Sequence, residues 1–368
     1  MKSILVLVYA AVYSQLADAI DFYVAPNGSD NNAGSTASAA FQTLSKAQQA
    51  VRSQIASSMT GNITVHIASG IYTLSTPLKF TAADSGKNGF SVNWVGPGAL
   101  ISGGHKVTGW TAGSNGVYSA SVPAGLKSRN LYVNGKASNF ARKKIANRKD
   151  FSYTSTSMKW TSSSYDWITS TAGITNGELR FINSFADRYA PIQAAGNREL
   201  VMKQNTWYNQ LWGYDTIPKN NADFGVWVQN VLALLTEGGQ FYHDSAAGKV
   251  YYKPLTGEKM ENIEAYLGVA ETLLVFGGTY DAPVHDIVFT DISFVSSTID
   301  TRNDYAKPHH RHIRRGCSRG SLDMSTNRRV AIFAKTRPTT HPILNRLAHS
   351  GAKCHPPFRS AQPEISPS

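Results

Sequence analysis

The segment from Phe22 to Arg52 constrains the fold more than any other part of the chain. It begins with a short strand pattern, Phe22-Tyr23-Val24, and continues through a turn-rich loop, Pro26-Asn27-Gly28-Ser29-Asp30. A helix pattern follows, in which apolar residues recur every three or four positions at Phe41, Leu44, Ala47, Val51 and Ile55. This spacing places them on one helix face, and Thr43 is the predicted N-cap. The segment therefore predicts an amphipathic helix that packs one apolar stripe against a partner surface.

A helix in this position is typical of the capped start of a parallel β-helix. The first coil of such a solenoid exposes an unpaired backbone edge, and a helix laid across that end covers it. The pattern alone also fits an α+β domain with an early helix. Short strand patterns then recur at 63–67, 71–74, 79–81 and 92–95, with turns predicted at 69–70, 84–86 and 96–98. Because no crossover helices separate them, an all-β solenoid or sandwich is favoured over an α/β fold.

The first 19 residues have the pattern of a secretory signal peptide. Lys2 precedes an apolar run from Ile4 to Val12, and Ala17-Asp18-Ala19 fits a small-x-small cleavage site. We expect an extracellular protein whose mature chain begins near Ile20, and no membrane segment, since no apolar run reaches the length of a spanning helix. Asn27 and Asn62 each begin an N-glycosylation triplet, although such triplets also occur by chance in turns and at strand starts.

The net charge of +12 is concentrated at one end of the chain. Residues 301–368 hold 13 Lys and Arg against 3 Asp and Glu, whereas residues 1–300 hold 23 against 21. The same segment contains both cysteines, Cys317 and Cys354, and shows no sustained period. We expect 301–368 to be a disordered basic tail or a mispredicted end of the sequence. The body is nearly neutral and has no cysteine, so it needs no disulfide and is not expected to bind nucleic acid.

The body divides into three predicted regions. Residues 20–125 form the cap and first coils, 126–267 an inserted β-rich subdomain, and 268–300 the start of further coils. The middle region holds five of the seven tryptophans and a hairpin pattern that joins 241–244 to 249–252. Strict apolar/polar alternation resumes from Pro283 to Phe294. The predicted fold is therefore mostly β, a right-handed parallel β-helix with a capping helix and an insertion.

The order and spacing of several short motifs resemble one family. They are Tyr23 to Asp30, the Ser69-Gly70-Ile71-Tyr72 turn, Ile101-Ser102-Gly103-Gly104, Leu131 to Lys136 and the Asp244 to Pro254 hairpin. From about Phe22 to Ser297 the chain is similar to secreted parallel β-helix proteins of the pectin-lyase-like superfamily, and most similar to those of glycoside hydrolase family 141. The resemblance implies a surface groove that binds cell-wall polysaccharide and two carboxylates that hydrolyse it.

Catalytic residues are not assigned by this resemblance. In that family the acidic residues lie on later coils, and here the coils should continue where the basic tail begins, so the chain is expected to lack its catalytic coils. Asp286 and Asp291 are five residues apart, which on an extended strand points them to opposite faces, a poor geometry for a pair that flanks one bond. We expect both to be solvated polar positions.

The candidate binding residues are aromatic. Trp207, Tyr208, Trp212 and Tyr214 lie in a polar stretch rich in Asn and Gln, and their rings could stack on sugar faces. Core packing is the other interpretation of the same cluster, because aromatic side chains supply much of a core's buried area.

Four functions remain open: a relative of glycoside hydrolases, a polysaccharide lyase, a non-catalytic carbohydrate-binding surface protein, and a binder of nucleic acid or acidic glycan through the tail. A lyase would need clustered Asp ligands for calcium, and the body has no such cluster in its sequence. We expect a monomer with a polysaccharide ligand, with no cofactor, no metal site, no nucleic acid and no membrane partner.

Overall fold

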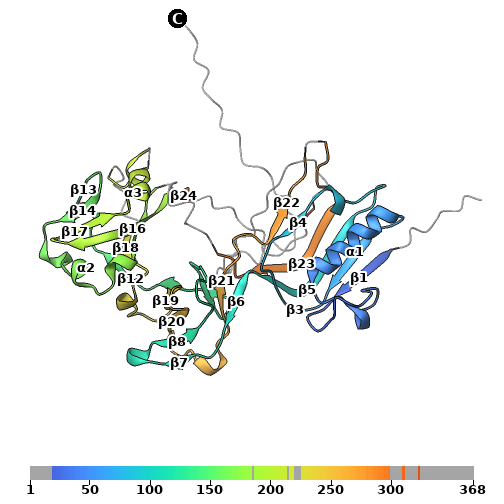
Figure 1. The fold of residues 1–368 in the computed structure, drawn as a ribbon, viewed down its shortest axis with the longest axis horizontal. Helices are drawn as coiled ribbons and strands as arrows, with labels where there is room; N and C mark the ends of the chain where they lie inside the picture. The colour runs from blue at the N-terminus through green and yellow to red at the C-terminus, as the bar shows by residue number, and fades with distance from the viewer. Residues whose placement is uncertain are drawn as a thin grey trace, which may run out of the picture. The chain divides into compact units, whose positions relative to one another are not determined.

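The computed structural model describes residues 19–184, 186–213, 215–218, 225–279 and 281–298, and two short strands, β24 (His309–His310) and β25 (Leu322–Asp323). The described chain is mostly β, as the sequence predicts (Figure 1). No helix among these residues is long and apolar enough to cross a membrane. Apart from Ala19, β24 and β25, the predicted signal peptide and tail lie outside the described residues.

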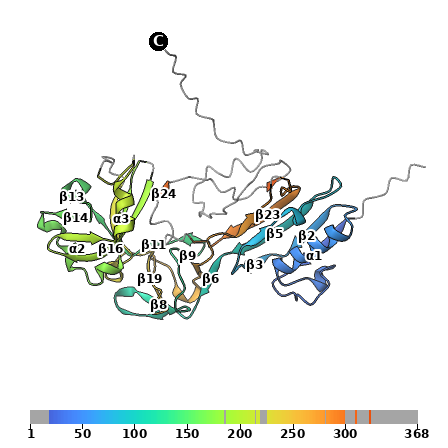
Figure 2. The ribbon, with the colours of Figure 1, turned by 45° about the horizontal axis from the view of Figure 1, so that its top comes forward.

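The amino-terminal part is built around a parallel sheet. Its strands are β1 (Ile20–Val24), β2 (Ile63–Ile67), β3 (Gly70–Thr73), β5 (Val92–Ser102) and β23 (Ile287–Val295), with β25 antiparallel at the edge. β1, β2, β5 and β23 lie side by side in register, and Ile20, Ile63, Val92 and Ile287 form one row (Figure 2). Parallel pairing also joins β4 (Leu78–Phe80) to β22 (Leu274–Phe276). Strands distant in sequence are thus stacked in parallel.

The predicted turn at 96–98 is wrong, because β5 passes through it without ending. The first half of β5 pairs with β2 and the second half with β3, and the register with β23 shifts between Thr290 and Ile292. Gly98 has a φ of +77° and Asp291, at the shift, a φ of +56°. Both left-handed residues bend their strands, so the glycines form a bulge within one strand.

The first core fills the space between the parallel strands and α1 (Leu44–Ser57), and it consists of the buried apolar side chains of α1, β1–β5, β22 and β23. The row Val65, Trp94 and Phe289 faces inward. The ring of Phe80 lies 5.7 Å from that of Trp94 and 5.5 Å from that of Phe289, both edge to face. Alternation along each strand sends these aromatic rings to the same interior.

Helix α1 begins and packs as the sequence predicts. The Thr43 side chain caps it by accepting from the N–H of Lys46, and the five residues of the apolar stripe are all buried. Asp30 fixes the entry to the helix, because its carboxylate accepts from the N–H groups of Gln42 and Thr43 and from the Thr43 hydroxyl. Burial acts to raise the pKa of Asp30, but the hydrogen bonds from Thr43 and Gln42 outweigh it and lower that pKa.

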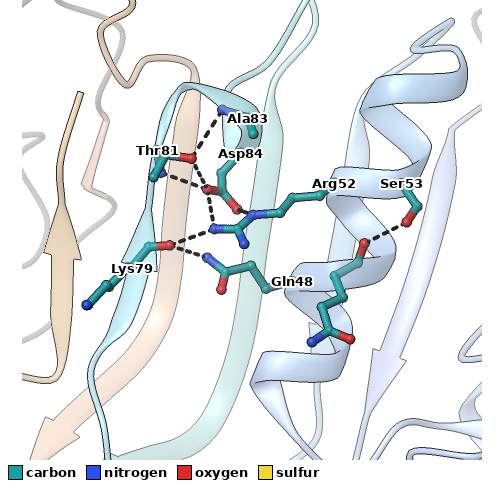
Figure 3. Close-up of polar contacts among 8 residues, drawn as sticks. Gln48, Arg52, Ser53, Lys79, Thr81, Ala83 and Asp84 are labelled. Carbon is teal, nitrogen blue, oxygen red and sulfur yellow. Dashed lines mark hydrogen bonds and ion pairs between the residues drawn. The ribbon is translucent and has the colours of Figure 1, made fainter. Parts of the chain in front are cut away.

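Two side chains of α1 cover the edge of β4 that faces away from β22 (Figure 3). Gln48 Nε2 and Arg52 Nη2 donate to the carbonyl of Lys79 at 3.0 and 2.8 Å. Arg52 also forms a two-pronged ion pair with Asp84, whose side chain is 2% exposed and which accepts from the N–H of Thr81. The helix therefore blocks an edge that another chain could otherwise pair with.

Antiparallel sheets form the rest of the described chain. The eight-stranded sheet has the order β12-β18-β15-β16-β17-β14-β13, with β24 beside β16. Its strands are β12 (Arg142–Ile145), β13 (Phe151–Tyr153), β14 (Ser157–Trp160), β15 (Glu178–Ile182), β16 (Ala186–Gly196), β17 (Glu199–Met202) and β18 (Val226–Gln229). With α2 (Trp167–Ser170) and α3 (Gln204–Leu211) it encloses the second core, the buried apolar side chains between residues 145 and 234.

Two smaller sheets enclose the third core, the buried apolar side chains of 107–133 and 241–267. Their strands are β6 (Gly104–Val107), β7 (Thr111–Ala112), β8 (Tyr118–Ser121), β9 (Leu131–Val133), β10 (Lys136–Ala137), β11 (Asn139–Phe140), β19 (Gln240–Asp244), β20 (Lys249–Lys253) and β21 (Ala265–Gly268). β19 and β20 confirm the predicted hairpin, and all pairs except β11–β19 are antiparallel. The predicted boundary at residue 125 falls inside this core.

Candidate functional site

Helix α3 divides the predicted aromatic cluster between the core and the surface. Its inner face carries Thr206, Trp207 and Gln210, all buried. Tyr208 and Trp212 are 63% and 70% exposed, which makes them the most exposed large apolar side chains of the described chain. Tyr208 lies within α3, and Trp212 is the extended C-cap residue that directly follows the last helical residue, Leu211.

Trp207 does not belong to a binding platform. Its side chain is fully buried, its indole Nε1 donates to the carbonyl of Thr154 at 2.9 Å, and its ring packs near that of Tyr153. A ring without an exposed face cannot stack on a sugar, so for this residue core packing is the correct interpretation. Tyr208 and Trp212 remain predicted binding residues, and Tyr214 lies outside the described residues.

A buried arginine supports the carboxyl end of α3. Arg188 is 2% exposed, and its Nη1 donates to the carbonyl of Asn209 and to Gln210 Oε1, both at 3.2 Å. The guanidinium thus lies where the helix dipole is negative. Burial lowers the pKa of Arg188, and the charge of Asp215 partly offsets this. Sequence reasoning missed this support, because no local pattern relates Arg188 to a helix some twenty residues later.

A second feature lies at the amino end of the same helix. A cavity of about 320 Å³ is lined by Thr175, Asn176, Gly177, Glu178, Pro191, Lys203 and Asn230. Lys203 directly precedes α3, and Glu178 begins β15. The polar lining offers amide, hydroxyl and ammonium groups, which suit hydrogen bonds to sugar hydroxyls. Its residues come from four separate segments, and no motif in the sequence relates them.

The carboxylate of Glu178 is held in place at this cavity. It pairs with both Nη atoms of Arg129, and Gln229 Nε2 donates to its Oε1 at 2.6 Å. The guanidinium of Arg129 in turn lies between the rings of Phe140 and Tyr189, at 5.1 and 5.0 Å from their centroids. These partners fix the Glu178 side chain, and Arg129 compensates its charge.

The other acidic residues considered from the sequence, Asp286 and Asp291, lie directly before β23 and within it. Asp286 pairs with its neighbour His285 at 2.8 Å, and Asp291 is exposed at the strand bulge. Both have left-handed backbone conformations, with φ near 55°. Asn27 and Asn62 are exposed, and Asn62 Oδ1 accepts from the N–H of Ser91. Glycosylation of these asparagines stays a prediction.

Comparison with solved structures gives one informative likeness. A chain described as "Glycoside hydrolase" matches 78% of this chain with a TM-score of 0.68 and 24% identity. The two share a fold. This chain spans about half of that structure's length, since 52% of it is covered. A second structure, "The complex structure of XylC with xylose", matches with a TM-score of 0.33, 11% identity, 78% of this chain and 36% of its own.

No protein-family model matches the sequence. No curated protein matches it either.

Proposed function

We propose that this chain is a secreted, carbohydrate-active protein that engages cell-wall polysaccharide, built on a right-handed parallel β-helix of the kind found in glycoside hydrolase family 141. The observation that carries the proposal is the fold likeness to a glycoside hydrolase over 78% of the chain. The in-register parallel strands β1, β2, β5 and β23, covered by α1, support the β-helix. Fold alone does not fix a function, so the site must supply the rest of the argument.

The surface of α3 supplies a place for the polysaccharide. Two exposed aromatic side chains, Tyr208 on α3 and Trp212 directly after it, offer faces for sugar rings, and the polar cavity begins beside Lys203 at the other end of the helix. Because Arg188 and the buried Trp207 hold α3 against the second core, the aromatic pair is presented on a rigid element. Rigid presentation lowers the entropy that binding must overcome.

Three carboxylates of the described chain are engaged in ion pairs and are not free to act as a catalytic pair. Glycoside hydrolysis uses two carboxyl groups about 5 Å apart for retention, or about 6.5–9.5 Å apart for inversion. Glu178, Asp187 and Asp84 are instead each tied to an arginine, at Arg129, Arg180 and Arg52. A non-catalytic carbohydrate-binding protein is therefore the second candidate, and a lyase the third.

Binding and turnover can be tested together. We expect the protein to bind xylan, pectin or a fucosylated glycan in affinity electrophoresis, and Trp212→Ala to weaken binding roughly tenfold, as removal of a stacking ring of this size implies. Leu255→Ala removes another exposed apolar side chain, 46% exposed, and should leave binding unchanged. Release of reducing ends without unsaturated sugar products would identify a hydrolase, release with such products a lyase, and no release a binding protein. An affinity that is unchanged in both Trp212→Ala and Tyr208→Ala would exclude the surface of α3 as the binding site.

A further inference from the structure

The edge strand β12 carries a concentration of positive charge on a nearly neutral body. Residues 142–149 include Arg142, Lys143, Lys144 and Lys149 and no acidic residue. β12 is the terminal strand of its sheet and pairs with β18 only. Lys143, Lys144 and Lys149 are exposed, and Arg142 is half-buried. The patch formed by Arg142, Lys143 and Lys144 is called the β12 patch below.

Among the described residues the β12 patch has no ion-pair partner. No carboxylate there lies within 4.0 Å of its three cationic groups. The three acidic residues on strands of the same sheet, Glu178, Asp187 and Glu199, form ion pairs with Arg129, Arg180 and Lys159. Burial lowers the pKa of Arg142, the nearby charge of Arg180 lowers it further, and Glu237 partly offsets both. The patch thus contains like charges that a bound anion would relieve.

Aromatic rings hold the cations of the patch in position. The Arg142 guanidinium lies 5.2 Å from the ring of Trp227, and the Lys143 ammonium 4.2 Å from the ring of Trp167. Register places Arg142 opposite Gln229 and Lys144 opposite Trp227. Residues two apart on a strand share a face, so Arg142 and Lys144 point the same way with about 6.6 Å between them along the strand. Arg142 and Lys144 are therefore presented side by side on one face, where the ring of Trp227 limits the freedom of Arg142, and Lys143 points to the other face.

We propose that the β12 patch binds the carboxylate or sulfate groups of an anionic polysaccharide. This inference rests on the proposed function and adds to it a class of ligand, a charged glycan, that the aromatic surface of α3 does not select. Arg142 offers a planar donor pair and Lys144 a point charge, which together suit oxyanions repeated along a polymer. Single-stranded nucleic acid fits less well, because it needs free aromatic faces, and the rings of Trp227 and Trp167 are covered by cations.

Lysines on an edge strand also have a purely protective role, since they discourage pairing with other chains. The two roles make different predictions. If the lysines only protect the strand edge, Lys144→Gln should promote self-association of the protein, and no glycan should shield Lys144 from an acetylating reagent. Ligand binding implies shielding of Lys144 and no change in association.

Lysine acetylation read by mass spectrometry tests the proposal locally, on the full chain. A local readout is needed because residues 301–368 carry a net charge of +10 and attract polyanions themselves. With polygalacturonate or dextran sulfate at about 150 mM salt, we expect slower acetylation of Lys144, whereas Lys143 on the opposite face of β12 and the exposed Lys249 on β20 are unaffected. Which of the two polymers protects distinguishes carboxylate from sulfate. Neutral xylan should not protect Lys144.

Affinity measurements complete the test. Lys144→Gln, and separately Arg142→Gln, should each weaken binding of the protecting polymer by up to about fivefold, and Lys249→Gln should have no effect. Equal protection of Lys249, protection by xylan or only by an oligonucleotide, or unchanged affinity in both variants would overturn the proposal. If the protein binds xylan through Trp212 while Lys144 stays unprotected, only this inference fails. If it binds none of these glycans, the proposed function fails.

Discussion

Two tryptophans five positions apart show that residue type alone does not decide the role of a side chain. Trp207 and Trp212 have the same chemistry, yet one is fully buried and the other 70% exposed. Trp207 lies on the inner face of α3, whereas Trp212 is the extended C-cap residue after the helix ends at Leu211. The role of each ring therefore follows from where its residue lies relative to α3.

This difference predicts opposite costs for one substitution. Trp207→Ala leaves a cavity in the second core and removes the hydrogen bond to Thr154, so we expect a loss of about 3–5 kcal/mol in the free energy of unfolding. Trp212→Ala should change it by no more than about 0.5 kcal/mol. Urea denaturation followed by circular dichroism measures both. Similar losses for the two variants would show that Trp212 is buried in solution.

His243 predicts a pH dependence of stability. It is 8% exposed, its Nε2 has no hydrogen-bond partner in the described structure, and burial lowers its pKa, partly offset by a hydrogen bond with the Ser128 backbone and by Asp244. A lowered folded-state pKa means that the unfolded chain binds the proton more tightly. The contribution of neutral His243 to the free energy of unfolding is therefore present above the pKa of the unfolded chain, about 6.5. It is lost as the pH falls through the lower pKa of His243 in the folded protein.

The expected result is a melting temperature that falls between pH 7 and pH 5, and falls less in His243→Gln than in the unaltered protein. His105→Gln is the matched control, since His105 lies half-buried on β6 and should leave the slope unchanged. An identical slope in all three proteins would rule out His243 as the titrating group.

At the scale of elements, α1 is the best understood part of the fold. Its apolar stripe covers the first core, while Gln48 and Arg52 satisfy the Lys79 carbonyl that β4 leaves unpaired. One helix thereby buries apolar surface and protects a strand edge. Both needs arise where a stack of parallel strands begins, which explains why such a helix occurs there.

Charge placed under this helix should be costly. Val51 is 1% exposed, so Val51→Asp buries an unpaired carboxylate, and we expect a loss of about 3 kcal/mol or more in unfolding free energy. Gln49→Asp puts the same group on the exposed face of α1 and should have little effect. Thermal unfolding of the two variants provides the comparison. An unchanged melting temperature for Val51→Asp would place that face in solvent.

At the scale of the molecule, the described chain contains three separate hydrophobic cores. The first lies among parallel strands and the other two among antiparallel sheets, and each is built from its own set of elements. Proteins with several cores commonly unfold in more than one step, because no single set of contacts couples them.

Calorimetry should therefore resolve more than one unfolding transition. Phe80→Ala, which empties the centre of the first core, should lower the temperature of one transition, and Trp207→Ala that of another. A single transition that both variants shift by the same amount would mean that the cores unfold as one unit.

The sequence by itself determined the features that depend on neighbouring residues. The helix from Leu44 with its Thr43 cap, the strands at 63–67 and 287–295, and the hairpin from Gln240 to Lys253 follow from local periodicity and turn chemistry. Tertiary structure alone decided that β5 runs through its glycines, that Trp207 is buried, and that Glu178 meets Arg129 across 49 residues of chain. Such pairings depend on strand register and packing between distant segments, and no local pattern encodes them.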